Sequence, residues 1–258
     1  MPYATVNGVR LYHEEQGTGD PILCIHGTSS SAMIWGPVLR QLTPLGRVIA
    51  YDRRGCTRSE RPEPYVTSVA QHADDAAALL EALDAAPAVV IGRSYGGETA
   101  LSLALRHPAT VRALVLLEAA VLSLDPEARR WADELHQRLL AVAADAPESV
   151  GRVFMEGVVG PAAWRSFPEP IQRMITDNGP AILAEFAGGI LDTDAKELGK
   201  IDVPTLLVAG SDSPPAFRRV TDLMADAIPG ARVELVGGGH LVSPAEPAVL
   251  AFLRELTV

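Results

Sequence analysis

A serine in a short glycine-rich segment is the side chain of this sequence best placed for covalent chemistry. Residues 92–96 read Gly-Arg-Ser-Tyr-Gly, which matches the G-x-S-x-G pattern of a nucleophilic serine at a sharp turn between a strand and a helix. An apolar run at 88–91 precedes the segment and a helical pattern follows it. Glycines two positions before and after the serine let strand and helix approach closely, and the turn strains the serine backbone. The pattern predicts Ser94 as a nucleophile.

A dinucleotide-binding turn is the alternative interpretation of this segment. A glycine-rich turn between a strand and a helix also binds pyrophosphate, and Glu118 ends the next apolar run roughly where a ribose-binding acid would lie. Ser94, however, replaces the middle glycine of G-x-G-x-x-G, and the turn does not lie in the first βαβ unit of the chain. These departures favour the nucleophile over the dinucleotide site.

Two further segments carry side chains or amides that a serine nucleophile needs. His240 follows three glycines at 237–239 and the apolar run 232–236, so it lies at the end of the last expected strand and comes last in chain order. Residues 26–28, His-Gly-Thr, close the run 22–25. In this chemistry one oxyanion donor comes from such a loop and the other from the residue after the nucleophile. We therefore predict His240 as general base and the amides of Thr28 and Tyr95 as oxyanion donors.

The elements that must position these residues alternate between strands and helices. The Asn7-Gly8 turn signal predicts an opening hairpin whose second arm is residues 9–14. Unbroken apolar runs, typical of strands covered on both faces of a parallel sheet, follow at 22–25, 47–51, 88–91, 112–117, 205–209 and 232–236. Helical patterns occupy 67–83, 99–105 and 244–256. The pattern predicts an α/β fold with a mostly parallel, doubly wound sheet of about eight strands and a ligand crevice at the carboxyl ends of its strands.

One long segment interrupts this alternation. Residues 119–202 contain helical stretches separated by prolines and no convincing strand, which predicts a helical lid inserted between strands 6 and 7. The expected domains are a core of residues 1–118 and 203–258 and a lid subdomain of residues 119–202. Four large aromatic side chains of the lid either line an apolar substrate pocket or pack its own helices: Trp131, Phe154, Trp164 and Phe186.

Composition excludes several kinds of partner. The 258 residues carry a formal net charge of −10 and no block of Lys and Arg, which argues against nucleic acid or an anionic membrane surface. Neither a signal peptide nor an apolar run long enough for a membrane span is visible. The only cysteines are Cys24 and Cys56, which we interpret as free thiols. We expect a cytoplasmic protein that acts on a small molecule, with a homodimer as a possible assembly.

With these residues in hand, the sequence resembles the α/β-hydrolase family over essentially its whole length. The resemblance rests on His26-Gly27, on Asp52-Arg53-Arg54-Gly55 with Ser59 downstream, on the nucleophile segment and on Gly239-His240. It implies the α/β-hydrolase fold and a structural role for Asp52. Cys56-Thr57 departs from the His-Gly that is common there, which affects loop shape more than chemistry.

The acid of the expected triad departs from the family pattern. Family members usually carry it three residues beyond a glycine after the seventh strand, but here Ser213 holds that position after Gly210, and Asp212 lies one residue early. Glu118 ends the preceding strand at the same crevice edge. A minority of the family, including lactone hydrolases that open zearalenone, resembles this second arrangement. We favour Glu118 as the acid and keep Asp212 as the alternative.

These residues predict acyl transfer to water by a Ser-His-Glu/Asp triad through an acyl-enzyme. We expect an esterase or lactonase acting on an apolar, uncharged substrate without metal or cofactor. Serine at position 94, where related dehalogenases and epoxide hydrolases carry aspartate, argues against those two chemistries. Carbon–carbon bond hydrolysis, perhydrolysis and acyl transfer remain alternatives on the same triad, as does a weakly catalytic ligand receptor of the same fold.

Overall fold

The computed structural model describes residues 2–256, and its centre is a single eight-stranded sheet in the order β1-β2-β4-β3-β5-β6-β7-β8. The strands are β1 (Tyr3–Val6), β2 (Val9–Gln16), β3 (Pro21–Ile25), β4 (Arg47–Tyr51), β5 (Ala88–Arg93), β6 (Val111–Leu117), β7 (Thr205–Gly210) and β8 (Arg232–Val236). β2 pairs antiparallel with β1 and β4, and all other neighbouring strands are parallel. The expected mostly parallel sheet of about eight strands is confirmed.

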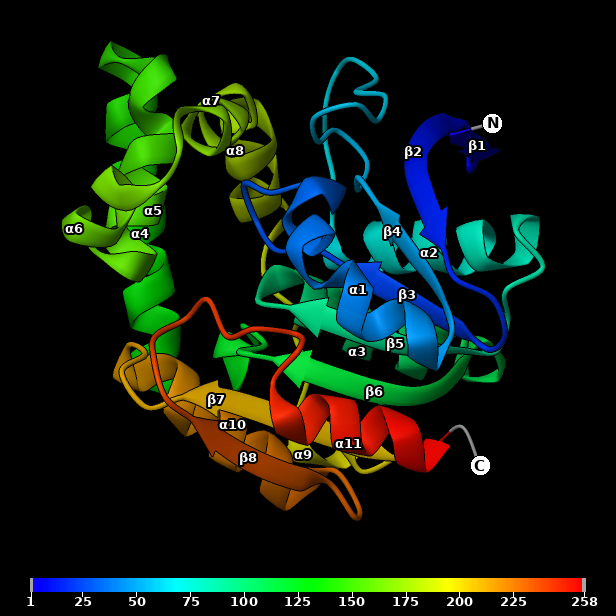
Figure 1. Ribbon diagram of the computed structural model, residues 1–258. Coiled ribbons are helices and arrows are strands. Elements are labelled where there is room, and N and C mark those ends of the chain that lie inside the picture. The colour runs from blue at the N-terminus through cyan, green and yellow to red at the C-terminus, as the bar shows by residue number, and fades with distance from the viewer. Residues whose placement is uncertain (1, 257–258) are drawn as a thin grey trace.

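Helices cover both faces of the sheet (Figure 1). The α-helices are α1 (Leu39–Leu42), α2 (Val69–Ala82), α3 (Tyr95–Arg106), α4 (Pro126–Asp145), α5 (Val150–Val159), α6 (Pro161–Ser166), α7 (Glu169–Asp177), α8 (Gly179–Gly188), α9 (Ala195–Leu198), α10 (Pro215–Ala227) and α11 (Pro247–Leu256). Helices α2 and α3 pack one apolar core against the sheet, together with side chains of α9 and α10. The 3-10 helix Ala32–Val38 and α11 form the core on the other face, around the buried Trp35.

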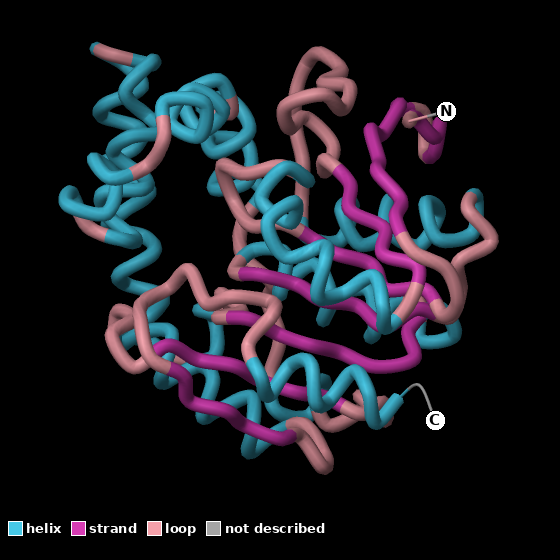
Figure 2. The backbone as a smooth tube through the Cα atoms, in the orientation of Figure 1, coloured by secondary structure: helices cyan, strands magenta, loops and turns pink. Residues whose placement is uncertain are grey.

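The carboxyl ends of the parallel strands point toward the helical insertion (Figures 1 and 2). Helices α4 to α8 all lie between β6 and β7 in the chain, and Figure 2 shows this part as helix and loop. The insertion has an apolar cluster of its own, which includes Leu139, Val150 and Ile182, all fully buried. A second cluster joins α4 to Phe217 and Val220 of α10, so the insertion packs against the sheet domain at its base.

The sequence predicted every strand of this sheet, but three details differ. β8 is not covered on both faces, because it is the edge strand and exposes Val233 and Leu235. Helix α10 was not among the helices expected, and α11 begins at Pro247 rather than near residue 244. Cys24 and Cys56 are buried free thiols. None of the helices in residues 2–256 is long and apolar enough to span a membrane.

Candidate active site

Ser94 occupies the turn between β5 and α3 in a backbone conformation that residues other than glycine rarely adopt. Its φ and ψ are 54° and −122°. The Ser94 amide donates to the carbonyl of Leu117 on β6 at 3.0 Å, which fixes the turn to the neighbouring strand. Glycine is needed at 96 because a Cβ there would collide with the carbonyl oxygen of Ile25, and at 92 because a Cβ would collide with that of Gly96. The close approach of strand, turn and helix therefore explains both glycines of the motif.

Glu118 and His240 form a buried hydrogen-bonded pair beside this turn. Glu118 Oε2 lies 3.0 Å from His240 Nδ1, and the residues are 0% and 5% exposed. The other oxygen, Glu118 Oε1, accepts the amide of Gly210 at the end of β7 at 2.5 Å. Glu118 itself has a φ of 52°, directly after β6. Both carboxylate oxygens are thus satisfied, and the pair stands where three neighbouring strands end.

Asp212 does not contact the histidine. Its side chain is exposed, and its Oδ1 accepts the hydroxyl of Ser211 at 3.1 Å. Its amide donates to the carbonyl of Gly238, so the residue links the loop after β7 to the glycine loop before His240. The one-residue shift relative to the usual family position therefore leaves Asp212 in the loop, whereas Glu118 lies under the imidazole.

The imidazole of His240 is also held by an aromatic contact that sequence analysis missed. The ring of Phe217 on α10 lies 4.1 Å from the His240 ring, centroid to centroid, at an interplanar angle of 41°. Trp131 of α4 contacts the Phe217 ring in turn, edge to face at 5.7 Å. No local pattern around Phe217 distinguishes it from a core phenylalanine, so only the fold reveals this contact.

The loop after β3 runs directly alongside Ser94. A Cβ on Gly27 would lie 3.1 Å from Ser94 Cβ and from the Arg93 carbonyl oxygen, so only a glycine backbone fits against the nucleophile without displacement. Thr28 lines the same cavities as Ser94, and Tyr95 is the first residue of α3. The first amides of a helix have no partner within it. The structure thus brings Thr28 and Tyr95 next to Ser94.

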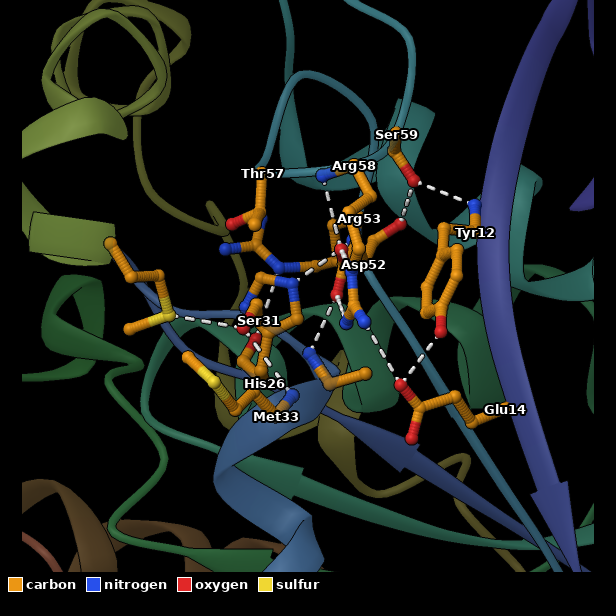
Figure 3. Close-up of polar contacts among 12 residues, drawn as sticks. Tyr12, Glu14, His26, Ser31, Met33, Asp52, Arg53, Thr57, Arg58 and Ser59 are labelled. Atoms are coloured by element: carbon orange, nitrogen blue, oxygen red, sulfur yellow. Dashed lines mark hydrogen bonds and ion pairs between the residues drawn. The ribbon is translucent and has the colours of Figure 1, made fainter. Parts of the chain in front are cut away.

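His26 is a structural residue of this loop (Figure 3). Its Nε2 accepts the amide of Arg53 at 2.9 Å, and its Nδ1 lies 2.8 Å from the carbonyl oxygen of Gly27. Complete burial and the nearby Arg53 charge hold the His26 pKa well below its ordinary value, so the ring is neutral. Asp52 accepts the amide of Ala32 at 2.7 Å and the guanidinium of Arg58, which agrees with a structural role.

Two cavities meet at Ser94. The first is walled largely by apolar side chains of the insertion and of α10. It is lined by Trp131, Leu135, Phe154, Val158, Phe186 and Phe217, among others. The second is lined by Ser94 and His240 together with Met155, Phe167, Ile171 and Met174 of the insertion. Ser94 therefore lines both cavities, and of these two His240 lines only the second.

Three of the four aromatic residues that were expected either to line a pocket or to pack the lid line the first cavity. Trp131, Phe154 and Phe186 line the first cavity. Trp164 lines neither cavity, because it packs edge to face on Phe167 at 6.1 Å inside the cluster of the insertion. For Trp164 the packing alternative is the one that the structure supports.

Sequence analysis missed two carboxyl groups in the wall of the first cavity. Glu98 on α3 is 1% exposed and its Oε2 accepts the amide of Leu191 at 2.7 Å. Burial, opposed by that hydrogen bond and reinforced by nearby Glu185, raises the Glu98 pKa to about 8. Glu185 on α8 is 2% exposed and pairs with Arg53. Within residues 2–256, no group of three or more His, Cys, Asp or Glu side chains is placed to hold a metal ion.

Comparison with known proteins agrees with this fold. A family model described as alpha/beta hydrolase fold matches residues 20–247. The chain therefore belongs to the alpha/beta hydrolase fold family, and its class is that of a hydrolase. The protein named "Putative carbamate hydrolase RutD" from Azorhizobium caulinodans is 32% identical over 260 residues, which cover 96% of this chain and 95% of the relative.

Solved structures extend the likeness over the whole chain. A thermophilic esterase from Thermogutta terrifontis, with malate bound, is 26% identical with a TM-score of 0.80, covering 100% of this chain and 98% of that one. Est816, described as an N-acyl homoserine lactone degrading enzyme, is 26% identical with a TM-score of 0.74, covering 99% and 98%.

Proposed function

We propose that the protein is a serine hydrolase that cleaves a carboxylic ester or lactone, with Ser94 as nucleophile, His240 as general base and Glu118 as the acid of the triad. The observation that carries the proposal is the buried 3.0 Å bond between Glu118 and His240 Nδ1, in a site where His240 and Ser94 line one cavity. A carboxylate on Nδ1 keeps the proton on that nitrogen and leaves Nε2 free to accept the serine proton.

The proposed reaction uses these groups in the following order. Nε2 of His240 removes the proton of Ser94 Oγ as Oγ attacks the substrate carbonyl carbon. The carbonyl oxygen becomes an oxyanion, which accepts hydrogen bonds from the Thr28 and Tyr95 amides. His240 returns the proton to the leaving alcohol oxygen, and the alcohol departs. A water molecule, deprotonated by His240, then attacks the acyl carbon, the bond from that carbon to Ser94 Oγ breaks, and His240 returns the proton to Oγ as the acid departs.

The two cavities divide the substrate between them in this proposal. Of the two cavities that contain Ser94, His240 lines only the second, so this proposal places the alcohol portion, whose oxygen His240 protonates, in the second cavity. The acyl portion then occupies the first cavity, whose apolar walls suit a hydrocarbon chain. Because α4, α5 and α8 supply much of those walls, the insertion acts as a lid that sets the length of acyl chain accepted.

A carbamate is the second candidate substrate. It is favoured by the relative named as a carbamate hydrolase, which matches 96% of this chain. The same nucleophile and oxyanion donors would serve, since a carbamate also presents a carbonyl carbon. The apolar first cavity favours an acyl chain, and the likeness to Est816 favours a lactone, so ester or lactone cleavage stands first.

The experiment that tests the proposal compares hydrolysis of p-nitrophenyl esters from acetate to octanoate, an acyl homoserine lactone and a p-nitrophenyl carbamate. Wild type is assayed beside Ser94→Ala, His240→Ala and Ser166→Ala, the last an exposed serine of α6 that serves as control. We expect activity in the wild type and the control and at least about a 10⁴-fold loss of kcat in the other two. Activity that survives in Ser94→Ala, or a wild type that neither hydrolyses a substrate nor reacts with a serine-directed phosphonate, would contradict the proposal.

A further inference from the structure

Arg53 donates hydrogen bonds to the loop that carries the Thr28 amide, one of the two proposed oxyanion donors. Its side chain is fully buried, its Nε donates to the carbonyl of His26 at 3.0 Å, and its Nη2 donates to the carbonyl of Gly27 at 2.9 Å. The guanidinium Cζ lies over the ring of Tyr95, 4.8 Å from the ring centroid. One side chain therefore contacts both the carbonyl of the Gly27–Thr28 peptide and the ring of Tyr95.

The contact with Gly27 fixes the direction of the Thr28 amide. The Gly27 carbonyl and the Thr28 N–H belong to one trans peptide, in which C=O and N–H point in opposite directions. The carbonyl is directed at Arg53 and at His26 Nδ1, both on the buried side of the loop. The N–H of Thr28 must then point to the other side, where Thr28 and Ser94 line both cavities.

The position of Arg53 depends in turn on the helical insertion. Glu185 Oε1 of α8 lies 2.7 Å from Arg53 Nη2, and the two side chains are 1% and 0% exposed. A buried guanidinium needs such a counterion, because an unpaired charge inside a protein is costly. Helix α8 also supplies Phe186 to the first cavity, so one helix contacts both the acyl space and the residue behind the oxyanion loop.

We propose that Arg53 is a positioning residue for the oxyanion site, and that Glu185 makes this position depend on the docked insertion. Arg53 touches no substrate; it holds the Gly27–Thr28 peptide in the orientation that turns the Thr28 N–H toward the reacting carbonyl oxygen. This inference rests on the proposed acyl-transfer function. It predicts that loss of Arg53 weakens binding of the tetrahedral oxyanion and leaves binding of the ground-state ester nearly unchanged.

The test removes the buried pair as a pair, with the neighbouring pair as a matched control. Arg53→Met/Glu185→Met leaves no lone buried charge, which keeps the variant folded. Arg54 is buried next to Arg53 in sequence and is held by Asp75 at 2.7 Å, but it contacts neither His26 nor Gly27 in any bond described. Arg54→Met/Asp75→Met therefore removes an equivalent pair away from the loop. Both variants are measured for Tm, for kcat and KM on a p-nitrophenyl ester, and for the Ki of a trifluoromethyl ketone, which forms a tetrahedral oxyanion on the serine.

We expect the Arg53 variant to lose about 10²–10³-fold in kcat, as on removal of one oxyanion donor, with KM changed by only a small factor. The Ki of the ketone should rise by the same factor as kcat/KM falls, while the Arg54 variant keeps its kcat and Ki whatever its Tm. Equal losses in the two variants, or an unchanged kcat in the Arg53 variant, would overturn the proposal. Failure of the proposed function shows separately, since wild type would then neither hydrolyse the ester nor bind the ketone, and the role of Arg53 would fall with it.

Discussion

Glu118 and His240 lie 122 positions apart in the chain, yet Glu118 Oε2 and His240 Nδ1 are 3.0 Å apart. β6 and β7 are neighbours in the sheet, and the Glu118 amide donates to the Val208 carbonyl of β7, which fixes the residue at the strand end. With Oε1 held by the Gly210 amide, only Oε2 is free to face the imidazole. Contacts with β7 thus orient the Glu118 carboxylate independently of its hydrogen bond to His240.

Replacing Glu118 by glutamine tests whether this arrangement sets the histidine tautomer. The Gly210 amide requires an acceptor, so the carbonyl oxygen of the glutamine side chain would take the place of Oε1 and its NH₂ group would face Nδ1. Nδ1 would then have to accept, and the proton would move to Nε2, which could no longer take the Ser94 proton. We expect Glu118→Gln to lower kcat by about 10⁴-fold with little change in KM.

Asp212→Asn is the matched control for that substitution, because Asp212 is exposed and bonds to Ser211. It should retain wild-type kcat on the same ester. The opposite result, a collapse of kcat in Asp212→Asn with an active Glu118→Gln, would transfer the role of the acid to Asp212.

The raised pKa of Glu98 predicts how the free energy of unfolding changes with pH. Its pKa rises from an ordinary 4.5 to about 8 in the folded protein. Between these two values the unfolded chain has lost the proton and the folded protein retains it, so the folded protein binds more protons. The free energy of unfolding therefore decreases as pH rises through this range and does not change further on this account above pH 8. Glu98→Gln keeps an acceptor for the Leu191 amide and removes the titration.

Thermal unfolding of wild type and Glu98→Gln between pH 5 and pH 9 measures this effect. The difference in Tm should shift in favour of the glutamine variant as pH rises, and level off above about pH 8. A difference that is constant over the range would show that Glu98 does not titrate there in the folded protein.

The lack of space around Gly96 predicts that a side chain at this position would destabilise the turn that carries Ser94. A Cβ at this position would collide with the carbonyl oxygen of Ile25 and lie 2.6 Å from that of His26, both backbone atoms that cannot move aside. Gly96→Ala should therefore separate α3 from β3 and destabilise the protein by about 1–3 kcal/mol, the usual cost of overpacking. Gly36→Ala is the control, since a Cβ there meets nothing within 4 Å and the residue does not have a positive φ. Chemical denaturation of both variants gives the comparison, and equal stability of the two would refute the steric argument.

The sheet and the positions of the site residues could be predicted because each signal is local. Ser94, Glu118 and His240 each follow an apolar strand directly or after a short glycine loop, and parallel strands bring their carboxyl ends to one edge of the sheet. The Asn7-Gly8 hairpin was likewise readable from a two-residue turn. Order along the chain and the type of each element were sufficient to assemble these residues.

The contacts that tune the site were not predictable, because they join side chains with no local signature. Arg53 reads as part of a loop motif, and nothing in its neighbourhood indicates that Glu185 reaches it from a helix 132 positions later (185 − 53). Phe217 contacts the histidine and Trp131 contacts Phe217, and this second contact forms because α10 and α4 pack together. The direction in which Trp164 points is decided in the same way, by tertiary packing of short helices.

Trp131 and Trp164 therefore make opposite predictions although both are tryptophans of the insertion. Trp131 lines the first cavity, so Trp131→Ala should enlarge the acyl space and weaken contact with long acyl chains. Since a methylene in an apolar pocket is worth about 10–200-fold in kcat/KM, preference for octanoate over acetate should fall by at least about 10-fold. Trp164→Ala removes a packed side chain that reaches neither cavity, so it should cost about 3–5 kcal/mol of stability and leave the preference unchanged. Kinetics on the p-nitrophenyl ester series, with unfolding curves for both variants, measure the two effects, and an altered chain-length preference in Trp164→Ala alone would show that the acyl chain lies elsewhere.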